Sequence, residues 1–170
     1  MNANALPRRL LRPLQTLAGL MLAGALLAAP LQAQEIYQAK SQTLYLPIYS
    51  HLWHGNLDKS GNPDKSYLSA LVSVRNTDTK NPIKVLSARY YDTDGKLLKD
   101  FVPKVRTIPP LGTLELFIER REDEGGSGAN FLIRWQAEAT VNTPQVEAVH
   151  VDLYSTKALS FITSARPIAE

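Results

Sequence analysis

Apolar and polar residues alternate along most of this chain in segments of strand length. In the first two segments, residues 43–54 and 67–75, even-numbered positions carry the apolar side chains of Leu44, Leu46, Ile48, Leu52, Leu68, Ala70, Val72 and Val74. Side chains two positions apart lie on one face of a β-strand, so each segment is predicted to be a strand with a core face. No convincing helical period appears after residue 42.

The alternation continues in five further segments and a weaker one: residues 83–91, 114–118, 131–138, 146–154 and 159–164, with 96–105 as the weaker strand. The turn-forming residues 76–82 predict a hairpin between the second and third strands. Residues 119–128 are charged and then glycine-rich, which indicates a solvated loop. Seven or eight short strands favour an all-β fold, a single immunoglobulin-like antiparallel β-sandwich, over an α/β enzyme.

The first 33 residues have the composition of an export signal. Three arginines, Arg8, Arg9 and Arg12, precede an apolar run over residues 14–29, and the small residue Ala33 follows the helix-breaking Pro30. We therefore expect a cleaved signal peptide over residues 1–33, a polar lead-in over 34–42 and the β-sandwich domain over 43–166. A retained membrane anchor is the alternative, although an apolar run shorter than about 20 residues disfavours it.

The net charge and the cysteine content exclude several classes of function. Removing the three leader arginines from the 19 basic residues leaves 16, which equals the 16 acidic residues. A neutral domain without Lys/Arg runs gives no indication of nucleic-acid binding. The chain contains no cysteine, which excludes disulfides, thiolate metal sites and a lipidated N-terminal cysteine. We expect a periplasmic or secreted protein with no membrane span after leader cleavage.

A series of short motifs resembles a known family. The motifs are YLPIYSHLWHG (45–55), VRNTD (74–78), RYYDTDGKL (89–97), GGSGANF (125–131) with Trp135, and VEAV (146–149). In this order they are similar to the bacterial exported family called domain of unknown function 3124, over residues 45–166. The resemblance implies a single extracytoplasmic domain. The family has no assigned activity, so the resemblance implies no functional residue.

The second face of the first strand carries an aromatic stripe. Tyr45, Tyr49, His51 and Trp53 are two or four positions apart, and Pro47 between them favours an edge strand or bulge. Such a stripe can stack on the sugar rings of a glycan or contact a partner protein. Burial beneath residues 56–66 as a second core is the alternative. Ser127 and Asn130 of the glycine-rich loop complete this candidate binding site.

The histidines suggest a second, metal-binding hypothesis. His51 and His54 would both face a Zn or Cu ion if the strand ended near His51, and His150 would be a third ligand. In a regular strand, however, residues three apart point to opposite faces.

Other site chemistries find less support. The Asp92–Gly95 turn lacks the later acidic ligand of a calcium loop, and Gly125–Ala129 lacks the last glycine of a nucleophile elbow. The sequence therefore predicts no enzyme and no cofactor. It predicts a non-catalytic binding or scaffold module for an envelope protein or glycan, with the histidine metal-binding protein as the alternative.

Overall fold

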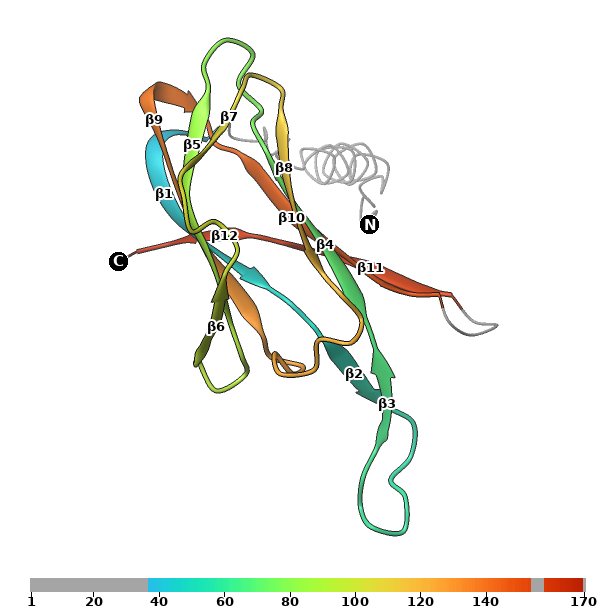
Figure 1. The fold of residues 1–170 in the computed structure, drawn as a ribbon. Helices are drawn as coiled ribbons and strands as arrows, with labels where there is room; N and C mark the ends of the chain where they lie inside the picture. Colours follow the sequence, from blue (N-terminus) through green and yellow to red (C-terminus); the bar gives the residue numbers. More distant parts are fainter. Residues whose placement is uncertain (1–36, 154–157, 170) are drawn as a thin grey trace, which may run out of the picture. The chain divides into compact units, whose positions relative to one another are not determined.

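The computed structural model describes residues 37–153 and 158–169, which all belong to one compact unit spanning residues 36–170. Every regular element among them is a strand (Figure 1). The twelve strands are β1 (Gln38–Pro47), β2 (His51–His54), β3 (Asp64–Tyr67), β4 (Ser69–Arg75), β5 (Ile83–Tyr91), β6 (Leu97–Asp100), β7 (Arg106–Ile108), β8 (Thr113–Ile118), β9 (Asn130–Asn142), β10 (Gln145–Asp152), β11 (Leu159–Ser164) and β12 (Arg166–Ile168). The predicted signal peptide lies outside the described residues.

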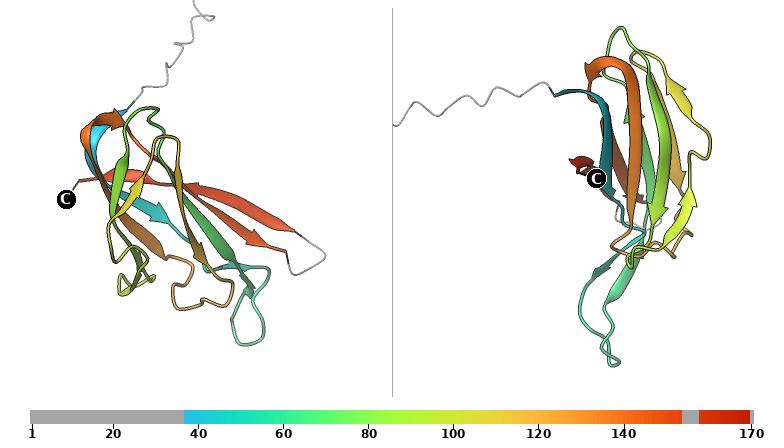
Figure 2. Two further views of the ribbon diagram at one scale, coloured as in Figure 1. Left: turned by 45° about the horizontal axis from the view of Figure 1, so that its top comes forward. Right: turned by 90° about the vertical axis from the view of Figure 1, so that its left-hand side faces the viewer.

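The strands form two main sheets and a separate hairpin. One sheet has the order β12-β1-β9-β5-β6, with β7 also paired to β5, and the other has the order β11-β10-β4-β8. The hairpin consists of β2 and β3 and extends away from both sheets (Figures 1 and 2). All pairings are antiparallel. The all-β prediction is confirmed, whereas the count of seven or eight strands is wrong.

The two main sheets lie in two layers around one apolar core (Figure 2). The core contains the inward side chains of both sheets, which are the alternating positions seen in the sequence: Leu44, Leu46, Ile48, Ala70, Val72, Val74, Phe131, Ile133 and Trp135. Full burial of one large apolar side chain contributes about 1.5–3 kcal/mol. The alternation therefore identified the residues that hold the sheets together.

The hairpin predicted across residues 76–82 is wrong, because β4 and β5 lie in different sheets. The polar side chains of this connection anchor it elsewhere. Asn76 donates its amide to the carbonyl oxygens of Asn81, Ile108 and Pro109 at 2.9, 3.2 and 3.0 Å, and the Asp78 carboxylate caps the backbone N–H of Lys80. Residues 76–82 do make the side-chain hydrogen bonds of turns, as predicted, but this connection carries the chain from one sheet to the other.

The strand predicted over residues 43–54 is divided in two. After β1 two further backbone hydrogen bonds tie the chain to the segment before β9, from the Ile48 N–H to the Ala129 carbonyl and from the Ser50 N–H to the Gly126 carbonyl. The chain resumes as β2, whose partner is β3. This break divides the predicted aromatic stripe, so its members do not lie on one continuous strand. Across residues 37–153 and 158–169, the structure has no helix long and apolar enough to span a membrane.

Candidate functional site

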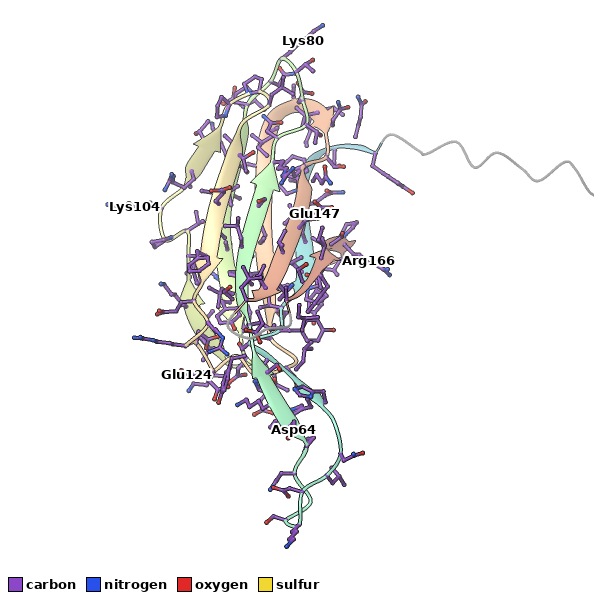
Figure 3. All side chains as sticks on the ribbon, turned by 90° about the vertical axis from the view of Figure 1, so that its right-hand side faces the viewer. Asp64, Lys80, Lys104, Glu124, Glu147 and Arg166 are labelled. Atoms are coloured by element: carbon purple, nitrogen blue, oxygen red, sulfur yellow. The ribbon has the colours of Figure 1, made fainter. Side chains whose placement is uncertain are left out.

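The β2–β3 hairpin gathers aromatic and charged side chains on one face. In its register His51 lies opposite Tyr67, and Trp53 lies opposite Lys65. Residues two apart share a face, so these four side chains form what we call the hairpin aromatic face. His51 is buried, whereas Trp53 is 51% exposed. Figure 3 shows the hairpin, marked by Asp64, projecting beyond the sheets.

The loop after β8 supplies an acidic partner to this face. Asp123 accepts hydrogen bonds from the Lys65 ammonium at 2.7 and 2.9 Å, and its Oδ1 lies 3.2 Å from His51 Nδ1. The hydrogen bond from Lys65 is the main reason that the pKa of Asp123 lies below its ordinary value. Burial, followed by the Lys65 charge, lowers the pKa of His51. At neutral pH the face therefore holds a neutral imidazole between a carboxylate and aromatic rings.

Ring contacts fix the exposed tryptophan in place. The Trp53 ring meets the His51 ring edge-on, with centroids 4.8 Å apart. The Lys65 ammonium lies 5.5 Å from the Trp53 centroid and 4.6 Å from the Tyr67 centroid, within the range of cation–π attraction. The Arg120 guanidinium also lies over the Tyr67 ring, 5.8 Å from its centroid, and pairs with Asp152 of β10. Trp53 is thus both exposed and preorganised.

A partly buried polar network anchors the same loop. Glu122 Oε2 accepts hydrogen bonds from Ser50 Oγ at 2.8 Å and from Tyr90 Oη at 2.6 Å, while Oε1 accepts from the Gly125 N–H at 2.9 Å. Burial is the main cause of a strongly raised pKa for the Tyr90 hydroxyl, which remains a donor. The sequence interpretation of residues 119–128 as a solvated loop missed this anchor, because Glu122 sits in a charged run.

We expect Glu122→Gln to destabilise the fold by about 1–2 kcal/mol. The carboxylate accepts charge-assisted hydrogen bonds from two hydroxyls, whereas the neutral amide of glutamine would turn its own NH₂ donor toward a backbone N–H. Urea unfolding would measure the change. Glu124→Gln, at an exposed position in the same loop, is the matched control and should change stability by less than about 0.5 kcal/mol. Equal effects of the two substitutions would contradict an anchoring role for Glu122.

The other members of the predicted stripe lie apart from the hairpin face. Tyr45 is on β1, where it pairs with Arg166 of β12, and is 37% exposed. Tyr49 packs edge-on against His150 and Phe161, with centroids 5.7 and 5.6 Å away. Of the predicted stripe, only His51 and Trp53 share the hairpin aromatic face, where His51 is buried and Trp53 is exposed, and Tyr49 belongs to a partly buried cluster.

The glycine-rich loop is held by backbone contacts. Gly128 donates its N–H to Thr93 Oγ1, and Thr93 in turn donates to the Gly125 carbonyl. Ser127 is half-buried, and Asn130 starts β9 opposite Pro47. Neither Ser127 nor Asn130 lies on the β2–β3 hairpin, so neither belongs to the hairpin aromatic face.

The three histidines do not converge. His150 Nε2 accepts the Tyr49 backbone N–H at 3.2 Å, and its ring stacks on Phe161 with centroids 4.6 Å apart. His54 lies 2.9 Å from Ser66 Oγ, on the opposite face of β2 from His51. Among the residues that the structure describes, no group of three or more His, Cys, Asp or Glu side chains is placed to hold a metal ion.

Comparison with known proteins agrees with the motif series found in the sequence. A family model described as "Protein of unknown function (DUF3124)" matches residues 41–168. The chain belongs to this family. The DUF3124 match spans all twelve strands except the first three residues of β1, so the hairpin face and the core lie inside it.

Other similarities add little to the DUF3124 assignment. No curated protein matches the chain. One solved structure, titled "Crystal Structure of Thermotoga maritima 1070", is similar at 10% sequence identity with a TM-score of 0.41, covering 74% of this chain and 92% of the other. A similarity of this size carries no conclusion, and any function must be argued from the site itself.

Proposed function

We propose that this DUF3124 protein is an exported, non-catalytic binding module with an immunoglobulin-like β-sandwich, and that its hairpin aromatic face binds an envelope protein or glycan. The observation that carries the proposal is the state of Trp53, which is 51% exposed yet held by the His51 ring and the Lys65 ammonium. A large apolar ring kept in water costs free energy unless a partner covers it. Its rigid support lowers the entropy cost of binding.

The polar groups around Trp53 suit recognition better than catalysis. Asp123 is already occupied by Lys65, and the buried His51 lies among rings. A ring that stacks on a ligand, bordered by an ammonium and a carboxylate that bond to hydroxyls or amides, is a common composition of binding sites. The same arrangement offers no activated nucleophile beside His51 within the described hairpin and its loop.

We expect Trp53→Ala to weaken association at least tenfold and to leave the fold intact, because the ring is half in solvent. Two assays separate the partner classes: pelleting of the protein with isolated cell-wall glycan, and photo-crosslinking to envelope proteins in the producing cell from position 57, which is 68% exposed in the same hairpin and leaves residue 53 free to vary. Val105→Ala, at a 55% exposed apolar position before β7, is the control. Binding by Trp53→Ala at the wild-type level in both assays would refute the proposal.

We further propose that the protein reaches the periplasm or the medium through cleavage after Ala33, as the leader composition suggests. Native mass spectrometry of protein isolated from the exported fraction should give a mass that begins at residue 34. An uncleaved mass would show that the leader is retained. The same spectrum reports any bound metal, and a metal adduct that His51→Ala removes would favour the alternative of a metal-binding protein.

A further inference from the structure

A row of large apolar side chains crosses the outward face of the β11-β10-β4-β8 sheet. The strand registers place Phe117 opposite Leu71, Leu71 opposite Val149, and Val149 opposite Ile162. Their inward neighbours, such as Val72 and Ala148, fill the core, so this row points away from it. Phe117 is 61% exposed and Ile162 is 60% exposed. The row therefore runs through all four strands of the sheet.

The row next to it alternates acidic and neutral residues. Its members, one on each strand in the order β8, β4, β10, β11, are Glu115, Ser73, Glu147 and Ser164. On the other side of the apolar row lie Ser69, Val151 and Ser160, with Glu119 just beyond the end of β8. A continuous apolar row whose borders are polar except at Val151 is typical of an association surface.

We propose that this outward face binds a second copy of the chain, with the two-fold axis parallel to the strands. This axis reverses the strand order of one sheet over the other, so that Phe117 lies over the partner's Ile162 and Leu71 over the partner's Val149. The apolar rows then cover each other completely. An isologous contact of this kind needs a surface that complements itself.

The acidic row decides the direction of the axis. With the axis along the strands, Glu115 faces the partner's Ser164 and Glu147 faces the partner's Ser73, so no two carboxylates meet. With the axis across the strands, Glu115 would face the partner's Glu119 and Glu147 would face the partner's Val151. Like charges placed opposite one another, or a carboxylate against an apolar side chain, are unfavourable.

The size of the face sets the strength of the association. Four strands about 4.8 Å apart, each about six residues long at about 3.3 Å per residue, give a face of roughly 20 by 20 Å. This area is below the roughly 800 Å² per partner of a stable complex. The dimer is therefore weak and forms at micromolar or higher protein concentrations.

Sedimentation velocity over a concentration series tests the dimer. The purified protein should shift from monomer to dimer as its concentration rises, and Ile162→Glu should weaken dimerisation at least tenfold. Val105→Glu, which adds the same charge at an exposed apolar position outside the sheet, should dimerise like the wild type. A protein that stays monomeric at millimolar concentration, or a dimer that Ile162→Glu does not weaken, overturns the proposal.

Cross-linking tests the axis, and it does not depend on the folding of Ile162→Glu. The chain has no cysteine, so single thiols can be introduced without background. A bismaleimide that spans the roughly 10 Å between stacked sheets should link Phe117→Cys protein to Ile162→Cys protein when the two are mixed. Each variant alone should link far less, because identical positions lie at opposite edges of the dimer. Efficient linking of Ile162→Cys to itself would refute this axis.

Discussion

Replacing Gly125 by alanine is expected to lower the free energy of unfolding by about 3 kcal/mol. A Cβ at this position would overlap the Tyr90 hydroxyl and would lie 2.7 Å from Ser50 Oγ. Both hydroxyls donate to Glu122, so the methyl group cannot be accommodated without breaking the network that anchors the loop. Overpacking typically costs 1–3 kcal/mol, and lost buried hydrogen bonds add to it.

Urea unfolding would measure this loss, and Gly61→Ala provides the matched control. Gly61 has a φ of +83° with nothing within 4 Å of its Cβ position, so its substitution costs only the backbone term of about 1 kcal/mol. In the double variant Gly125→Ala/Tyr90→Phe, the loss should be smaller than the sum of the single losses, because the clash and the hydroxyl are removed together. A Gly125→Ala protein as stable as Gly61→Ala would show that the loop shifts freely.

Acid should destabilise the protein through His150. Burial lowers the pKa of this imidazole from 6.5 to about 4. Between these two values the unfolded chain binds a proton that the folded chain does not, so the free energy of unfolding falls as the pH falls through this window. The expected loss is about 2 kcal/mol from pH 7 to pH 5, because each pKa unit corresponds to about 1.4 kcal/mol. Above about pH 7 this contribution is complete and constant.

Denaturant unfolding at pH 5 and pH 7 tests the role of His150. His150→Phe, which keeps a ring beside Phe161, should remove most of the difference between the two pH values. A smaller part should persist, because burial also lowers the pKa of His51. The exposed His54 supplies a control, since His54→Gln should keep the full difference. If His150→Phe retains the wild-type pH dependence, another group is responsible.

The alternation of apolar residues located several strands closely. The predicted segments 83–91 and 159–164 have the same bounds as β5 and β11. The alternation in β5 is not strict, because its pairing with β9 shifts register between Val85 and Ser87, so strand length and composition located this strand as much as alternation did. The break at residues 48–50 was not predicted, because the alternation continues through it. At the break the backbone N–H groups of Ile48 and Ser50 bond to the carbonyls of Ala129 and Gly126, which are distant in the chain, so local sequence does not show these partners.

The sequence alone indicated only about half of the residues in the candidate site. His51 and Trp53 stood out as aromatic residues two positions apart, but Lys65 and Asp123 did not. The pairing of Lys65 with Trp53 depends on a nine-residue connection between β2 and β3, and Asp123 comes from a loop nearly 60 residues further along. A cue was available, because Gly55 and Gly61 mark a turn-rich connection between two short strands.

The position of β1 governs the order in which the chain can fold. This strand lies between β9 and β12, and its Thr43 pairs with Arg134 on one side and with Ile168 on the other. Both neighbours come from the last quarter of the chain. The backbone of β1, the first of these strands to be synthesised, therefore cannot be fully paired until the last strand has been made. Contacts between such distant segments slow folding, because a long loop must close before they form. During synthesis the backbone of β1 therefore stays unpaired until the C-terminal residues arrive.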